Sequence, residues 1–145
     1  MNADGGEEGR TCLKGYCDNI EKRTVENDDF RRVLYTGSNL QLVLMTLPPG
    51  CDIGEEVHPD RDQFFRIEEG TGVVDIDGAE NDVQDDFAVI VPAGARHNVR
   101  NTGSEPLRLY TIYGPPEHKD QVVQATKQEA EARHHAEEWD GRTTE

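Results

Sequence analysis

The chain has 145 residues, of which 34% are hydrophobic, and its 30 acidic and 15 basic side chains give a net charge of -15. This length is enough for one domain that buries a real hydrophobic core. The strong negative charge argues against nucleic acid or an anionic membrane surface as a partner, because both repel such a field.

The acidic excess extends through the whole chain and does not form a tail. Residues 1–29 carry eight acids and four bases, residues 30–116 carry fourteen and seven, and residues 117–145 carry eight and four. Only four of the bases are lysines, and none of these lies between residues 30 and 116. Uniform acidity with few lysines favours a halophilic protein, in which concentrated salt screens the repulsion between carboxylates. An ordinary acidic cytoplasmic protein is the alternative.

We expect no signal peptide, because the N-terminal segment is polar and acidic and has no apolar core. Its first eleven residues are rich in Gly, Asp and Glu, and we expect them to be disordered within an acidic N-terminal arm over residues 1–29. No apolar run approaches the roughly 18 residues of a membrane helix. The cysteines are odd in number and contain no C-x-x-C pair, so no disulfide framework is expected. We therefore expect a cytoplasmic protein with reduced thiols at Cys12, Cys17 and Cys51.

From residue 30 onward, short apolar segments alternate with turn-forming residues. Residues 16–27, which precede them, are of mixed character and leave open a short strand or an arm. Residues 39–47, NLQLVLMTL, are apolar on both faces, as is typical of a buried strand, and Pro-Pro-Gly ends them. Asp77-Gly78 is a favourable hairpin turn. The other predicted strands are residues 30–37, 54–58, 63–68, 72–76, 87–91, 96–100 and 107–113.

Many short strands without intervening helices predict an all-β sandwich or barrel over residues 30–116. A helical tail is expected over residues 117–145. Within it, Thr126 to Glu129 has the form of a capping box, and the helix formers that follow predict one helix over residues 127–138. His118 is expected in a loop, and His134 and His135 are expected to be solvated on the helix.

Two of the predicted strands bring histidines toward one another. Glu56 and His58 share a strand face because side chains alternate, and Gln63 lies on the returning strand. If this face is the inner one, the three side chains and His97 point into one cavity. Two imidazoles and one carboxylate suit Mn(II), Fe(II), Ni(II) or Zn(II). Gln63 is either a weak fourth ligand or a hydrogen-bonded core amide.

These residues resemble the two motifs of the cupin family. The first motif is similar to Gly50, Glu56-x-His58, Gln63 and Gly70, and the second to Pro92-x-Gly94-x-x-His97-x-x-x-Asn101. The segments DQFFRIEEG, VPAGARHNV and LRLYTIYGPPEH are similar to small cupins described as mannose-6-phosphate-isomerase-like, a label that does not establish a sugar-phosphate activity. The resemblance implies a cupin-type β-barrel, that is a double-stranded β-helix or jelly-roll, and a homodimer.

The chain departs from the family pattern at the expected metal site. Metal-binding cupins usually use three His and one Glu, whereas here Glu56 stands at the first His position and Gln63 at the Glu position. Asp86 also stands where the second motif usually opens with glycine. Two imidazoles and one carboxylate remain beside a neutral oxygen donor, so the affinity for a divalent metal is expected to be lower.

Two functions fit the sequence. The first is a metalloenzyme that holds a divalent metal on Glu56, His58, Gln63 and His97. It would act on a small molecule by dioxygenation, decarboxylation or isomerisation, with Glu56 as the candidate catalytic base if it is not a ligand. The alternative is a non-catalytic cupin that binds a small molecule with weak or no metal. The sequence selects neither the substrate nor the metal.

Overall fold

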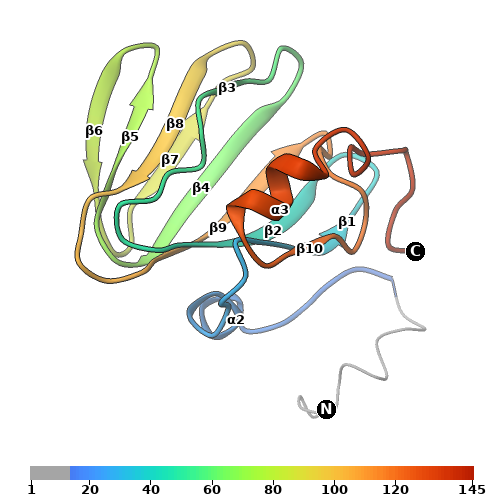
Figure 1. Cartoon of the computed structure of the whole chain (residues 1–145). Coiled ribbons are helices and arrows are strands. Elements are labelled where there is room, and N and C mark those ends of the chain that lie inside the picture. The colour runs from blue at the N-terminus through green and yellow to red at the C-terminus, as the bar shows by residue number, and fades with distance from the viewer. Residues whose placement is uncertain (1–13) are drawn as a thin grey trace.

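Two antiparallel β-sheets form the framework of the computed structural model, which describes residues 14–145 (Figure 1). The larger sheet has the strand order β10-β1-β2-β9-β4-β7, and the smaller has the order β3-β8-β5-β6. The prediction of an all-β fold with a C-terminal helix is confirmed. The disorder expected for residues 1–11 and the thiol at Cys12 lie outside the described residues.

The strands follow the predicted segments closely, with two additions. The sequence did not predict two edge strands, the polar β6 and the two-residue β10. The bounds are β1 (Arg31–Thr36), β2 (Gln41–Leu47), β3 (Glu56–Val57), β4 (Asp62–Glu69), β5 (Gly72–Ile76), β6 (Ala79–Val83), β7 (Ala88–Val91), β8 (Arg96–Asn101), β9 (Leu107–Gly114) and β10 (Val123–Gln124).

The hydrophobic core lies between the two sheets. Side chains of β4 and β9 are buried at alternate positions, which places Phe65, Ile67 and Leu109 inside. Val74 and Val99 meet them from the smaller sheet. Burying each such side chain contributes about 1.5–3 kcal/mol. This core fixes the distance between the two sheets. It therefore also fixes the separation of polar side chains that the two sheets direct toward one another.

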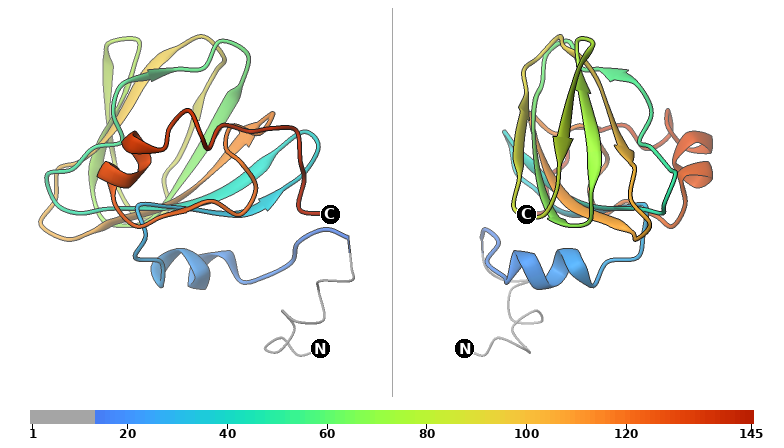
Figure 2. Two further views of the ribbon diagram at one scale, coloured as in Figure 1. Left: turned by 45° about the vertical axis from the view of Figure 1, so that its right-hand side comes forward. Right: turned by 90° about the vertical axis from the view of Figure 1, so that its left-hand side faces the viewer.

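A short helix covers the outer face of the larger sheet. Helix α2 (Ile20–Val25) lies in the segment for which the sequence left open a strand or an arm, and the Asn19 side chain caps it by accepting from the Lys22 amide at 3.0 Å. Figure 2 shows α2 beneath the sheet. The segment after α2 is held against β2, because the Thr46 hydroxyl donates to the Asn27 carbonyl at 2.7 Å. Residues 43–47 of β2 are therefore buried on both faces of the strand.

The C-terminal helix begins where it was predicted but ends earlier. Helix α3 (Lys127–Ala132) starts at the expected capping box, with the Thr126 hydroxyl accepting from the Glu129 amide at 3.1 Å. The predicted continuation to residue 138 is wrong. The backbone there pairs instead with the segment after β9, since the Lys119 amide donates to the Glu137 carbonyl at 2.8 Å. This pairing holds residues 117–119 against the tail.

The hairpin between β5 and β6 shows why β6 was not predicted from the sequence. Asp77 and Gly78 both have positive φ, 49° and 89°, which confirms the predicted turn. The returning strand β6 is exposed except for Val83, so its polar sequence carries no apolar alternation. Backbone pairing with β5 alone makes it a strand.

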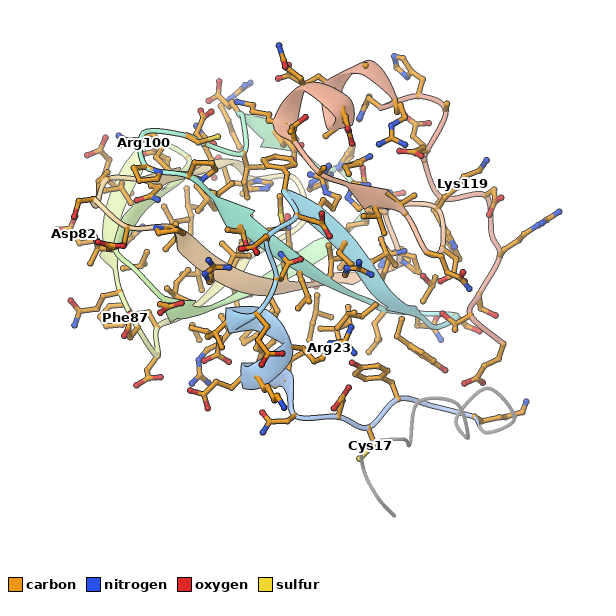
Figure 3. All side chains as sticks on the ribbon, turned by 60° about the horizontal axis from the view of Figure 1, so that its bottom comes forward. Cys17, Arg23, Asp82, Phe87, Arg100 and Lys119 are labelled. Atoms are coloured by element: carbon orange, nitrogen blue, oxygen red, sulfur yellow. The ribbon has the colours of Figure 1, made fainter. Side chains whose placement is uncertain are left out.

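Charged side chains project from the surface, as the labelled Asp82 and Lys119 show in Figure 3. Cys17 is an exposed free thiol and Cys51 is a half-buried one. The longest helices within residues 14–145 have six residues, and none of them is able to span a membrane.

Gly72 is expected to be essential for sheet pairing. A Cβ added there would lie 2.4 Å from the Arg100 carbonyl oxygen on β8, whereas one added at Gly37 meets nothing closer than 3.4 Å. We expect Gly72→Ala to lower the free energy of unfolding by about 1–3 kcal/mol because the strands must separate. Urea denaturation measures this, with Gly37→Ala as the control. Equal stability of the two variants would contradict it.

Candidate metal centre

Pairing between β3 and β8 places Glu56 directly opposite His97. His58 follows β3 on the same face as Glu56, as alternation predicted, while Val57 between them is exposed. The carboxylate of Glu56 and the imidazoles of His58 and His97 each offer a ligand atom, and these atoms all lie within 4.8 Å of one another. Three of the four predicted site residues therefore meet in a geometry that suits one metal ion.

Gln63 completes the group from the other sheet. It lies on β4, is 3% exposed, and its Oε1 is 3.2 Å from Nε2 of His97. The imidazoles of His58 and His97 are also buried, with 5.3 Å between ring centroids. The side chains of all four predicted residues thus gather at one place, between the end of β4 and the β3–β8 pair.

The hydrogen bonds of His97 and Gln63 leave two acceptors facing one another. A backbone carbonyl only accepts, so His97 Nδ1 donates its proton to the Ala95 carbonyl at 3.0 Å, and a ring in its neutral form then has its lone pair on Nε2. The Thr111 hydroxyl donates to the Phe64 carbonyl at 2.8 Å, so it accepts from the Gln63 amide nitrogen at 3.0 Å. Gln63 Oε1 therefore faces the His97 lone pair, and a cation between them would satisfy both atoms.

Glu56 and His58 form a partly buried acid–base pair. His58 Nε2 lies 3.1 Å from Glu56 Oε1. Burial opposes ionisation of Glu56, but the hydrogen bond and charge of His58, with the charges of Arg31 and His97, outweigh it and lower the pKa of Glu56. Burial likewise opposes protonation of His58, but the hydrogen bond to Glu56 and the charge of Glu117 outweigh it and raise the pKa of His58.

A second carboxylate, which the sequence did not single out, lies behind His58. Glu117 Oε1 is 3.6 Å from His58 Nδ1 and 3.0 Å from the Arg61 Nε. Burial raises the pKa of Glu117, against the opposing charges of His58 and Arg61. A carboxylate on the far nitrogen of a histidine orients the ring and makes it a better ligand.

His118 lies in the loop after β9, as predicted, and is half-buried. Its Nε2 is 3.3 Å from the Tyr113 hydroxyl, and it forms a β-bridge with Glu138. Burial lowers the pKa of His118 well below its ordinary value and raises the pKa of Tyr113. No periodic pattern crosses the Pro-Pro pair before Glu117, so no sequence signal indicates that Glu117 and His118 return to the site.

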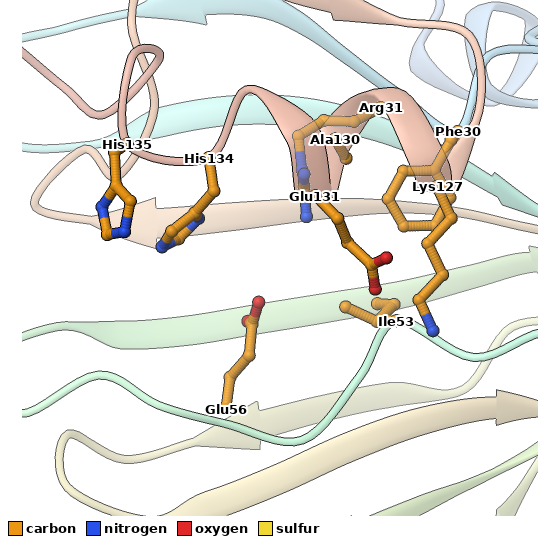
Figure 4. A pocket seen from close by; sticks show the side chains of 9 residues that line it. All are labelled: Phe30, Arg31, Ile53, Glu56, Lys127, Ala130, Glu131, His134 and His135. Atoms are coloured by element: carbon orange, nitrogen blue, oxygen red, sulfur yellow. The ribbon is translucent and has the colours of Figure 1, made fainter.

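A cavity of about 320 Å³ opens beside the centre, between α3 and the segment that leads into β3. Figure 4 shows Glu56 rising into it from one wall. His134 and His135 lie at its mouth and are 55% and 92% exposed, as expected from their place near the end of the helix. With Glu138 they form a second, exposed group of potential metal ligands.

The comparisons with known proteins agree with this architecture. A family model described as "Cupin domain" matches residues 43–113. The uncharacterized protein YrkC of Bacillus subtilis is 46% identical over 125 residues, which cover 82% of this chain and 67% of YrkC. The crystal structure of BH2720 from Bacillus halodurans has 46% identity and a TM-score of 0.81, and the match covers 83% of this chain and 96% of that one. The tetracenomycin polyketide synthase protein TcmJ of Streptomyces glaucescens is 36% identical over 69 residues, which cover 48% of this chain and 46% of TcmJ.

Proposed function

The chain belongs to the cupin family, and we propose that it binds one divalent metal ion on Glu56, His58 and His97, with Gln63 as a neutral oxygen donor, and acts on a small molecule. The observation that carries this proposal is the pair of facing acceptors, Gln63 Oε1 and His97 Nε2, at 3.2 Å beside a carboxylate and a second imidazole. Two imidazoles with oxygen donors suit Mn(II), Fe(II), Ni(II) or Zn(II).

Each residue of the centre has a distinct part in this proposal. When bound, the ion supplies Lewis acidity to a molecule in the adjacent cavity. Glu56 lies both in the centre and in the cavity wall, so it is the residue that a bound molecule would meet. Glu117 and the Ala95 carbonyl hold the far nitrogens of His58 and His97, which orients both rings. Dioxygenation, decarboxylation and isomerisation all remain compatible with these parts.

Non-catalytic binding of a small molecule is the second candidate function. The hydrogen bond to His58 helps to lower the pKa of Glu56, which makes this carboxylate a weak general base. Recovery of a bound small molecule unchanged from metal-loaded protein, measured by mass spectrometry, would favour this function, whereas its conversion would favour an enzyme.

Thermal unfolding tests the metal proposal. A ligand that binds only the folded state at about 100 times its Kd stabilises it by about 2.7 kcal/mol. We therefore expect Mn(II), Fe(II), Ni(II) or Zn(II) to raise the Tm of the protein. The same ion should raise the Tm of a His134→Ala/His135→Ala variant equally, since that variant lacks only the imidazoles of the exposed group of potential ligands. No rise with any of the four ions would contradict the proposal.

Metal affinity is expected to fall in mild acid. A bound imidazole must be deprotonated, and the pKa of His58 in the metal-free protein lies above its ordinary value, so protons compete below that raised pKa. The pKa of Glu56 is lowered, so this carboxylate stays ionised throughout. Below the His58 pKa we expect the affinity for Mn(II) to drop at least about tenfold per pH unit, as at least one proton is displaced from an imidazole ligand.

Isothermal titration from pH 8 to pH 5.5 measures this pH dependence. The matched variant is Glu117→Gln, which removes a charge that raises the pKa of His58, so the fall in affinity should begin at a lower pH. An affinity that stays constant over this range in the wild type would show that His58 is not a ligand.

A further inference from the structure

Arg31 is a buried cation without a carboxylate partner among the described residues. It opens β1 and is 6% exposed, and none of the ion pairs within residues 14–145 includes it. Its Nη1 donates to the neutral Gln124 side chain at 2.8 Å. The charge of Glu56 acts on Arg31 without an ion-pair contact between them. Because a buried charge is costly unless it is paired directly, the guanidinium favours a partner that comes from outside the chain.

One edge of the Arg31 guanidinium, formed by the buried Nε and by Nη2, has no hydrogen-bond partner among the described residues. Gln124 is fixed because its amide nitrogen donates to the Glu137 carboxylate at 2.8 Å, so its oxygen must face Arg31 Nη1. Arg31 Nε has no hydrogen-bond partner, and Nη2 donates to none of the described residues. These two N–H groups are parallel donors on one edge of a planar group, the arrangement that matches both oxygens of a carboxylate.

The guanidinium lines the same cavity as the proposed metal ligand Glu56. Figure 4 shows Arg31 entering from one wall and Glu56 from the opposite one. Phe30 packs its ring 5.2 Å from the guanidinium carbon, and with Ile53 it makes part of the wall apolar. The other cavity cation, Lys127, is already paired with Asp52. Arg31 is thus the cation in this cavity that remains to bind an anion.

We propose that this cavity binds a small organic acid whose carboxylate pairs with Arg31 and whose remainder extends toward Glu56. The placement of the rest of the acid near Glu56 rests on the proposed metal function. The contact between its carboxylate and Arg31 does not depend on that proposal. Glu56 and Glu131 also line the cavity, so a doubly charged phosphate would meet more repulsion than a carboxylate, which carries a single charge. The apolar wall at Phe30 and Ile53 suits the carbon skeleton of such an acid.

Isothermal titration with benzoate, benzamide and inorganic phosphate tests this site in wild type and Arg31→Met, each with and without Mn(II). We expect benzoate to bind the wild type in preference to its neutral isostere and to phosphate, and Arg31→Met to bind benzoate about 10- to 100-fold more weakly, as for loss of hydrogen bonds to a charged group. Lys127→Met is the matched control from the same cavity, and it should retain most of the affinity.

A second variant and a second readout separate the outcomes. Arg31→Lys keeps the charge but loses the two parallel donors, so it should not restore the affinity for benzoate. Mn(II) binding and circular dichroism show whether the variants are folded. Equal binding of benzoate and benzamide, preference for phosphate, or unchanged affinity in folded Arg31→Met would overturn the inference while leaving the metal proposal intact. Arg31-dependent benzoate binding by a protein that takes up no metal would uphold the inference and refute the metal proposal.

Discussion

Replacing His97 with alanine is expected to lower the affinity for Mn(II) by more than about 100-fold, because loss of even an outer hydrogen-bond partner of a metal ligand typically costs 10- to 100-fold. The imidazole of His97 is buried and its Nδ1 is bound to the Ala95 carbonyl, so Nε2 is fixed toward Glu56 and Gln63. No neighbouring described side chain occupies an equivalent position to replace it. Isothermal titration at pH 8 measures the loss.

The exposed His134, His135 and Glu138 provide the matched control for this variant. A His134→Ala/His135→Ala variant removes two imidazoles, one more than His97→Ala, yet it should bind Mn(II) as the wild type does. If this surface variant loses the metal and His97→Ala retains it, the binding belongs to the surface group and the buried centre is not a metal site.

Gln63→Glu is expected to raise the affinity for Mn(II) by at least about tenfold, which corresponds to about 1.4 kcal/mol. The Gln63 oxygen already faces His97 Nε2 at 3.2 Å, so the substitution places a second carboxylate charge at that position with little change of volume. A divalent cation is attracted more strongly by an ionised oxygen than by a neutral amide oxygen. Isothermal titration of both proteins at pH 8 gives the ratio.

Gln63→Glu is expected to raise metal affinity but to lower the folding stability of the metal-free protein. Gln63 donates to the Thr111 hydroxyl at 3.0 Å, and a carboxylate has no proton to give, so the buried pair is broken. We expect Gln63→Glu to lower the free energy of unfolding by about 1–3 kcal/mol without metal and to regain it when metal is added. Unchanged or weaker Mn(II) binding by a folded Gln63→Glu protein would mean that residue 63 does not face the ion.

The β framework was largely predictable because its signal is local. Alternation at Phe65 and Ile67, apolar residues on both faces of β2, and the Asp77-Gly78 turn each depend on near neighbours in the sequence. The strand β6 was missed because it is stabilised by backbone pairing with β5 and not by an apolar face. The early end of α3 depends on pairing with residues 117–119, which no helix propensity encodes.

The candidate site was predictable only in part for the same reason. Alternation placed Glu56 and His58 on one face, but the pairing of Glu56 with His97 depends on the non-local register between β3 and β8. Glu117 is brought back by tail contacts beyond two prolines. Arg31 lies beside Arg32 at the start of β1, and it is the buried one of the two because it shares a strand face with the buried Val33.

The metal content of the protein, purified without chelator and dialysed against Mn(II), is the most direct test of the account. Elemental analysis of the His134→Ala/His135→Ala background is expected to give about one ion per chain, and the same background carrying His58→Ala and His97→Ala is expected to give almost none. A content far below one ion per chain in the first protein, or an equal content in both, would contradict a metal centre at Glu56, His58 and His97.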